Sequence, residues 1–337
     1  MRLNVKKILG TGIRLTIGIG LAYLLINLTL KHTQTDLWNE LLASRWSLLA
    51  SALIFYGAII AITIWRWAML LKVQGIYLRA GDIIRLSMLG NFFNLSLPGA
   101  VSGDFLKIAF LSQHAKDKKL KAALTVLLDR VIGLFGLFIV AVVMLLIYMP
   151  FLYSLGNTYR PVKIAALTVG TGSVIMALGI ALVLCGGALM HHPRIGGFIR
   201  HGKGRFPDFI TSRLARLFEA LQMYNRSRGT VFKAVLLSVL VHASLAINMF
   251  VIGAGVNENG LRLSDYFLAT QVSNAIAGIP VTPAGIGARD ATMSMFLIAL
   301  GAPLEKAGVV PVMLTLIILF WGLVGGIVFL FTRISKK

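Results

Sequence analysis

The sequence predicts an all-α protein, a polytopic membrane helix bundle with two broken, re-entrant helical hairpins in an inverted repeat. The first two observations are compositional: 57% of the 337 residues are hydrophobic and only 13% are charged. The third is a mean hydropathy of +0.83. Soluble domains carry about 25% charged residues, so this composition excludes the soluble globular and disordered classes. We therefore expect a single integral membrane domain over residues 1–337.

Six segments are long and apolar enough to cross a hydrocarbon core about 30 Å thick. They are residues 8–30, 47–71, 122–149, 162–189, 231–254 and 307–331. The basic N-terminus precedes the first segment without a small-residue cleavage site, so we expect a retained span and not a signal peptide.

Two further apolar regions, residues 83–111 and 266–300, are each interrupted by proline and glycine. The interruptions, at 97–103 and 280–287, carry enough of both residues to stop a helix. Each region is therefore predicted to form two short helices joined by an irregular turn. Irregular backbone at membrane depth is tolerated only inside protein or beside a wet cavity.

The net charge is +21, from 33 lysine and arginine residues against 12 aspartate and glutamate residues. Most of the basic residues lie between spans, which suits anionic lipid headgroups, and no motif for binding nucleic acid is visible. If each broken region leaves the membrane on the side where it entered, most of the positive charge falls on the side of the N-terminus. The positive-inside rule then predicts that both termini are cytoplasmic.

Two parts of the chain match at an offset of 183 residues, which predicts repeats over 47–149 and 230–332. The matching positions are Leu78, Arg79, Asp82 and Asn91 in the first copy and Leu261, Arg262, Asp265 and Asn274 in the second. Three predicted spans separate the copies, so the second is inverted, as in many transporters. The alternative is coincidence between two helices broken by glycine and proline. The basic segment 191–229 between the copies contains an amphipathic pattern, which fits either a surface helix or an ordinary connecting helix.

Several ionisable residues lie within or beside the apolar segments. A charge at the centre of a lipid-facing helix costs about 2.5–3.5 kcal/mol, so these residues must face protein, a wet cavity or the interface. They are Arg66, Asp104, Lys107, Asp129, Arg130, His242, Arg289 and Asp290.

The charges of the first half each allow two interpretations. Arg66 lies between two tryptophans, which fits either an interfacial anchor or a headgroup ligand. Asp104 either caps the helix after the first break or joins Lys107 at an anion site, and Lys107 could instead reach the interface. Asp129 and Arg130 are adjacent and point about 100° apart on a helix, so at least one is expected to pair with another helix.

In the second hairpin, Gly285 and Gly287 are expected to bare backbone N–H groups beside Arg289, a combination that suits a phosphate diester. Asp290 could instead neutralise Arg289. The amides Asn91, Asn94, Gln271 and Asn274 fit interhelical hydrogen bonds, and His242 fits a core position. No catalytic constellation, metal cluster or phosphate-binding loop is visible, so we expect no enzymatic activity, no cofactor and no metal site.

These motifs resemble the lysylphosphatidylglycerol synthase transmembrane family, also called flippase-like domain proteins, over roughly residues 2–331. The resemblance rests on four segments: Trp65-Arg66-Trp67, the stretch from Asn91 to Asp104, Leu127 to Val131, and Pro280 to Asp290. The family usually has glutamate at positions 129 and 290, where this chain has aspartate. Some members are fused to an aminoacyltransferase, and we expect this chain to be a stand-alone member without it.

The resemblance implies translocation of a membrane lipid of an anionic, polyprenyl or hopanoid type, in a bacterial inner membrane. The alternative is a non-transporting accessory subunit of a lipid-modifying or cell-envelope glycosyltransferase system. The expected partners are a membrane phospholipid or another lipid, with a homo-oligomer or a lipid-synthase partner left open. The candidate residues for binding the lipid headgroup are Arg66, Asn91, Asn94, Asp104, Lys107, Asp129, Arg130, Asn274, Gly285, Gly287, Arg289 and Asp290.

Overall fold

The computed structural model describes residues 37–96, 102–114, 119–190, 223–224, 227–278 and 285–331, and it confirms the all-α prediction. No strand occurs in these ranges. The helices are α2 Leu37–Leu42, α3 Trp46–Val73, α4 Ala80–Ser96, α5 Ser102–His114, α6 Lys119–Ile147, α7 Met149–Ser154, a 3-10 helix Asn157–Tyr159, α8 Arg160–Met190, α11 Arg228–Gly255, α12 Leu263–Ala277, α13 Ala288–Ala299 and α14 Leu304–Phe331.

Five of the six predicted spans are confirmed as long apolar helices. Helices α3, α6, α8, α11 and α14 each contain a stretch long and apolar enough to cross a membrane. They have few polar interruptions, and each can satisfy its backbone hydrogen bonds internally, as the hydrocarbon region demands. The predicted span 8–30 lies outside the described residues, as does the amphipathic pattern in 191–229 up to residue 222.

Each predicted break separates a pair of short helices that pack together side by side. In the first pair the backbones of α4 and α5 approach so closely that a Cβ on Gly103 would lie 2.1 Å from the carbonyl oxygen of Gly90. In the second pair a Cβ on Gly285 would lie 2.5 Å from the Cβ of Ala277. The turns that contain Pro98 and Pro283 lie outside the described residues.

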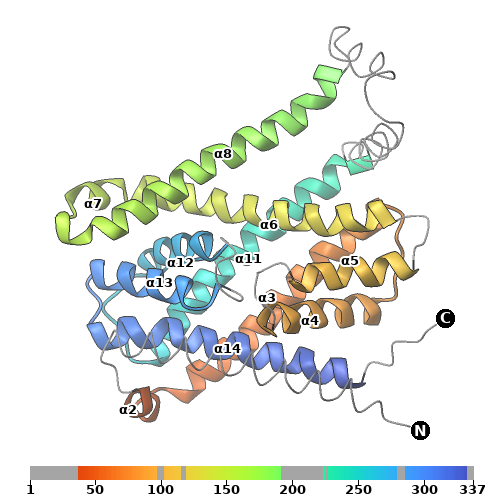
Figure 1. Cartoon of the computed structure of the whole chain (residues 1–337). Coiled ribbons are helices and arrows are strands. Elements are labelled where there is room, and N and C mark those ends of the chain that lie inside the picture. The colour runs from red at the N-terminus through yellow and green to blue at the C-terminus, as the bar shows by residue number, and fades with distance from the viewer. Residues whose placement is uncertain are drawn as a thin grey trace.

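The two short-helix pairs lie on opposite sides of the crossing helices α3 and α11 (Figure 1). Helix α14 packs against α4 and α13, and helix α6 packs against α5 and α12. The long helices α6 and α14 therefore each contact one helix from both pairs. This arrangement places the charged residues of the short helices against the long helices α6 and α14.

The polarity of the packed helices suits a membrane environment. Helix α14 is the most enclosed, with a continuous buried stretch from Ala307 to Thr315. Large apolar side chains are instead exposed on the outer faces of α3, α6 and α8, among them Ile54, Leu146 and Ile175. Exposed apolar surface of this extent marks contact with lipid or with other protein.

Candidate functional site

The first charged group joins α5 to α6. Arg130 Nε donates to Asp104 Oδ2 at 2.5 Å, and the Arg130 side chain is 45% exposed whereas that of Asp104 is 7% exposed. Asp104 therefore pairs with the following span, not with Lys107 one turn along its own helix. Asn94 accepts a hydrogen bond from the Gly103 N–H at 2.8 Å, which ties the start of α5 to α4. The Asn94 side chain thus forms an interhelical hydrogen bond with the backbone of α5.

Arg66 is buried and forms an ion pair with α6. Its Nε lies 2.8 Å from Asp129 Oδ1 on α6, and its side chain is only 6% exposed. Trp65 faces outward and Trp67 inward, so the three-residue motif points in different directions around α3. The Arg66 charge is therefore compensated by Asp129, and the ion pair joins α3 to α6.

Lys107 packs over Trp67 on α3. Its ammonium nitrogen lies 4.8 Å from the centre of the Trp67 ring, a cation–π distance. Asn91, on α4, is half-buried. The structure thus brings Arg66, Asp104, Lys107, Asp129 and Arg130 to one region where α3, α5 and α6 meet.

In the second hairpin Arg289 forms an ion pair with its neighbour Asp290, as one of the two interpretations of the sequence allowed. Arg289 Nη2 lies 2.7 Å from Asp290 Oδ1, and both side chains are almost fully buried. Thr315 on α14 donates to Asp290 Oδ2 at 2.9 Å, and the Arg289 guanidinium also contacts the Thr315 hydroxyl. The described residues offer no hydrogen-bond partner to Nη1 of Arg289.

The backbone N–H of Gly287 is used within this hairpin. The Gly287 N–H donates to Asp290 Oδ2 at 3.2 Å, so Asp290 caps the start of α13. Gly285 is buried against Ala277 and has a φ of +71°, which an L residue rarely adopts. Both glycines are therefore required for close packing and for turn geometry, since α13 must begin directly beside the end of α12.

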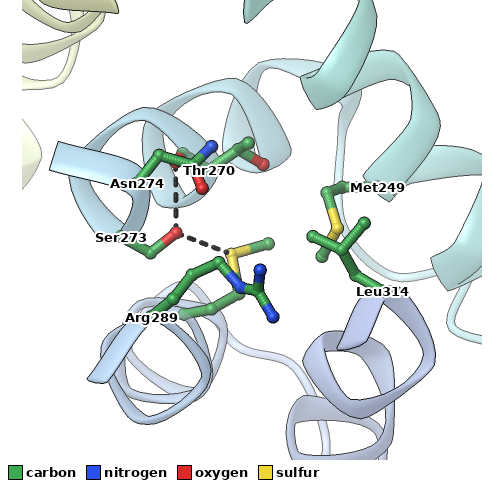
Figure 2. A pocket seen from close by; sticks show the side chains of 7 residues that line it. Met249, Thr270, Ser273, Asn274, Arg289 and Leu314 are labelled. Atoms are coloured by element: carbon green, nitrogen blue, oxygen red, sulfur yellow. Dashed lines mark hydrogen bonds between the residues drawn. The ribbon is translucent and has the colours of Figure 1, made fainter. Parts of the chain in front are cut away.

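A narrow pocket lies between α11, α12, α13 and α14 (Figure 2). It is lined by Met249, Thr270, Ser273, Asn274, Arg289, Met293 and Leu314, and it is too narrow for a water molecule to enter. Figure 2 shows the Arg289 side chain reaching toward its centre from α13. Thr270 Oγ1 and Asn274 Nδ2 are buried and have no hydrogen-bond partner. The pocket is thus closed, but it retains unused polar capacity.

The sequence reasoning missed Thr270, Ser273 and Thr315. A signal for the first two was present, because residues 270, 273 and 274 are spaced to share one face of an otherwise apolar helix. Thr315 had no such signal, because a single threonine in a span commonly bonds its own helix backbone. Gln271 fits its expected interhelical role, since its Nε2 donates to the His242 carbonyl. His242 fits its expected place as a bonded histidine inside the bundle, since its ring bonds the Gly133 carbonyl.

The profile described as the lysylphosphatidylglycerol synthase TM region matches residues 13–326. The chain belongs to this family. No curated protein matches the sequence.

Membership of the lysylphosphatidylglycerol synthase TM-region family gives the chain a role connected with membrane lipids. Together with the five long apolar helices, it identifies a multi-pass membrane protein. Within the described residues of this family member, no three His, Cys, Asp or Glu side chains gather as a metal site would require. The charged clusters are instead built from arginine, lysine and aspartate.

Proposed function

We propose that this protein translocates a membrane lipid, with the headgroup held in the pocket between α11 and α14 while the acyl chains remain in the bilayer. The observation that carries the proposal is the unused polar capacity of Thr270 and Asn274 beside Arg289 at one pocket. All three can donate hydrogen bonds, so a ligand rich in acceptor oxygens, such as a headgroup phosphate, fits them best. The proposed role is transport without a catalytic step.

The closed pocket fits one state of a transport cycle. A headgroup could enter only if the α12–α13 pair moves relative to α11 and α14. Because Gly285 packs tightly against Ala277, the pair would move as one body. Rigid movement of one repeat around a fixed site is the usual basis of alternating access.

The packing supports an inverted repeat of residues 47–149 and 230–332. The contact of α4 with α14 has a counterpart in the contact of α12 with α6, and α3 packs directly on α11. The acidic residues also correspond: Asp104 bonds from α5 to Arg130 on α6, and Asp290 bonds from α13 to Thr315 on α14. In an inverted repeat, each contact between the two halves has a counterpart in which the equivalent helices come from the opposite halves.

The finer features belong to the same proposal. The substrate is an anionic, polyprenyl or hopanoid-type lipid, and the membrane is a bacterial inner membrane with both termini in the cytoplasm. The excess of basic residues on the side of the predicted N-terminus supports this orientation. Transport without an ATP-binding motif would be passive, coupled to an ion, or driven by a partner.

Thr270→Val tests the headgroup site most directly. Valine has a similar shape and replaces only the hydroxyl; Thr270 is 1% exposed, and its buried hydroxyl has no hydrogen-bond partner. Removing an unpaired buried hydroxyl leaves the free energy of unfolding unchanged or raises it. If the pocket binds a headgroup, translocation of fluorescent phospholipids in proteoliposomes should fall at least severalfold while thermal stability is retained.

Arg160→Gln is the control for loss of an exposed polar side chain, because Arg160 is exposed at the start of α8 and does not line the pocket. Arg289→Gln is the less direct variant, since it leaves the buried Asp290 without its cation and should cost about 3–5 kcal/mol of stability. A stable Thr270→Val protein with wild-type translocation would contradict the site. Wild-type protein that moves lipid no faster than protein-free liposomes would contradict the function.

A further inference from the structure

We propose that the first hairpin holds a separate anion site, in which Lys107, Trp67 and Ser87 bind a phosphate group that carries one negative charge. The inference rests on the proposed function in one respect: it names the charge class of the lipid, whose phosphate would be the ligand in the membrane. The site itself lies on α3, α4 and α5, apart from the pocket around Arg289.

The charges of the first half leave one cation uncompensated. Arg66 is paired with Asp129, and Arg130 is paired with Asp104. Among the described residues no carboxylate forms an ion pair with the Lys107 ammonium, although Asp104 and Asp129 belong to the same cluster. The five side chains therefore sum to one positive charge. A partly buried charge of this kind is costly unless a ligand neutralises it.

Lys107 is held in place from two sides. Its ammonium lies over the Trp67 ring at 4.8 Å. Its side chain also crosses Gly90 on α4, where an added Cβ would lie 2.8 Å from the lysine Cε. A lysine that extended freely toward the interface would not be enclosed between a tryptophan and a glycine. The position of the ammonium is therefore set by the fold.

Two buried polar groups on the helices that enclose Lys107 lack partners. Trp67 Nε1 and Ser87 Oγ have no hydrogen bond, and the two residues are 1% and 5% exposed. Ser87 lies one turn before Gly90 and so shares the face of α4 that packs on α5. Unpartnered buried donors are uncommon in native structures and are often accounted for by a ligand or an ordered water.

The chemistry of these groups selects the ligand. An ammonium and an indole N–H can only donate, and a serine hydroxyl can donate as well. The ligand must therefore offer several acceptor oxygens and one negative charge, which describes a phosphodiester or a phosphate. A zwitterionic headgroup brings its own cation, so it would leave the net positive charge of the five side chains uncompensated.

The test measures binding without transport. Purified protein in a neutral detergent is heated with short-chain phosphatidylglycerol, short-chain phosphatidylcholine or inorganic phosphate, since a ligand that binds only the folded state raises Tm. Wild-type Tm should rise with phosphatidylglycerol and not with phosphatidylcholine. Lys107→Gln should weaken the phosphatidylglycerol response about tenfold or more in apparent Kd, because a hydrogen bond to a charged group is lost.

Three variants serve as controls. Lys72→Gln removes an exposed lysine from the last turn of α3 and should leave the response unchanged, which excludes a general effect of positive charge. Lys107→Arg keeps the charge and should keep the preference for phosphatidylglycerol. Trp67→Phe keeps an aromatic ring but removes the N–H, so it should bind more weakly than wild type and more tightly than Lys107→Gln.

A response of Lys107→Gln equal to that of wild type would overturn the site, as would equal stabilisation by phosphatidylglycerol and phosphatidylcholine. Stabilisation by inorganic phosphate that also requires Lys107 would support the site and identify a soluble phosphate as a second source of ligand. Wild-type protein that shows the Lys107-dependent response but moves no lipid in proteoliposomes would support this site while contradicting the proposed function.

Discussion

The adjacent charged residues Asp129 and Arg130 have different partners, and the partner of each determines which helices it holds together. Asp129 pairs back to α3 through Arg66, whereas Arg130 pairs with Asp104 on α5. Neighbours on a helix point about 100° apart, so the pair can connect α6 to two different helices. The two ion pairs therefore fasten the first hairpin and its preceding span to α6.

The buried pair should be far more important for stability than an exposed one. Arg66→Gln is expected to lower the free energy of unfolding by about 3–5 kcal/mol, because it leaves Asp129 buried without its cation. Arg85→Gln is the control, since Arg85 lies 3.7 Å from Asp82 at an exposed position and should contribute under about 1 kcal/mol. The measurement is unfolding in detergent. Equal effects of the two variants would contradict the structural role of Arg66.

Combining Arg66→Gln with Asp129→Asn checks the pairing itself. With both charges gone, no buried charge is left uncompensated, so the double variant should be more stable than the sum of the single losses predicts. Strict additivity of the two substitutions would mean that the residues do not interact.

Tyr148, between α6 and α7, should confer sensitivity to alkaline pH. Partial burial and its hydrogen bond to Asp265 raise the pKa of Tyr148 to about 12, above the ordinary value of 10.0. Between these values the unfolded chain loses the proton that the folded protein retains, so stability falls as pH rises through this window. Tyr148→Phe should flatten the decline in Tm from about pH 10 to 12 that this group causes. An unchanged slope would contradict the assignment.

At the scale of the elements, the close approach of α4 and α5 depends on the absence of a side chain at Gly103. A Cβ there would meet the Gly90 backbone at 2.1 Å, and backbone cannot move aside cheaply. The α12–α13 pair has the same requirement at Gly285. Each hairpin is thus assembled around one glycine contact.

Gly103→Val should separate α4 from α5 and lower the free energy of unfolding by at least about 1–3 kcal/mol, the usual cost of overpacking. Gly81→Ala, in the first turn of α4, is the matched control, because its Cβ would meet nothing within 4 Å. Alanine there should be neutral or slightly stabilising, since glycine is a poor helix former. Thermal unfolding of the two variants distinguishes them, and a stable Gly103→Val protein would contradict the tight hairpin.

At the scale of the whole molecule, the orientation in the membrane is open to chemical labelling. In a Cys185→Ala background, single cysteines at positions 118 and 205 should resist a membrane-impermeant reagent applied from outside, because both positions lie in segments predicted to be cytoplasmic. A cysteine at position 160, on the opposite side, should react. Strong labelling of position 118 from outside would contradict the re-entrant arrangement of the first hairpin.

The repeat makes a further prediction at this scale. In an experimental structure, residues 47–149 and 230–332 should superpose by rotation about an axis in the membrane plane, with the turns at Pro98 and Pro283 approaching each other near mid-membrane. The reciprocal packing of α4 on α14 and α12 on α6 already fits such an axis. Superposition about the membrane normal would contradict it.

The sequence by itself determined the fold class, the five described spans and the two interruptions, because hydropathy, length and helix-breaking residues act locally. It also marked which polar residues had to be enclosed. Only the tertiary structure decided most of their partners: Arg66 with Asp129, Arg130 with Asp104, and Thr315 with the adjacent pair Arg289 and Asp290. The tertiary structure likewise leaves the Lys107 ammonium without a carboxylate partner among the described residues. Pairing depends on which helix faces meet, and that follows from packing between segments far apart in the chain.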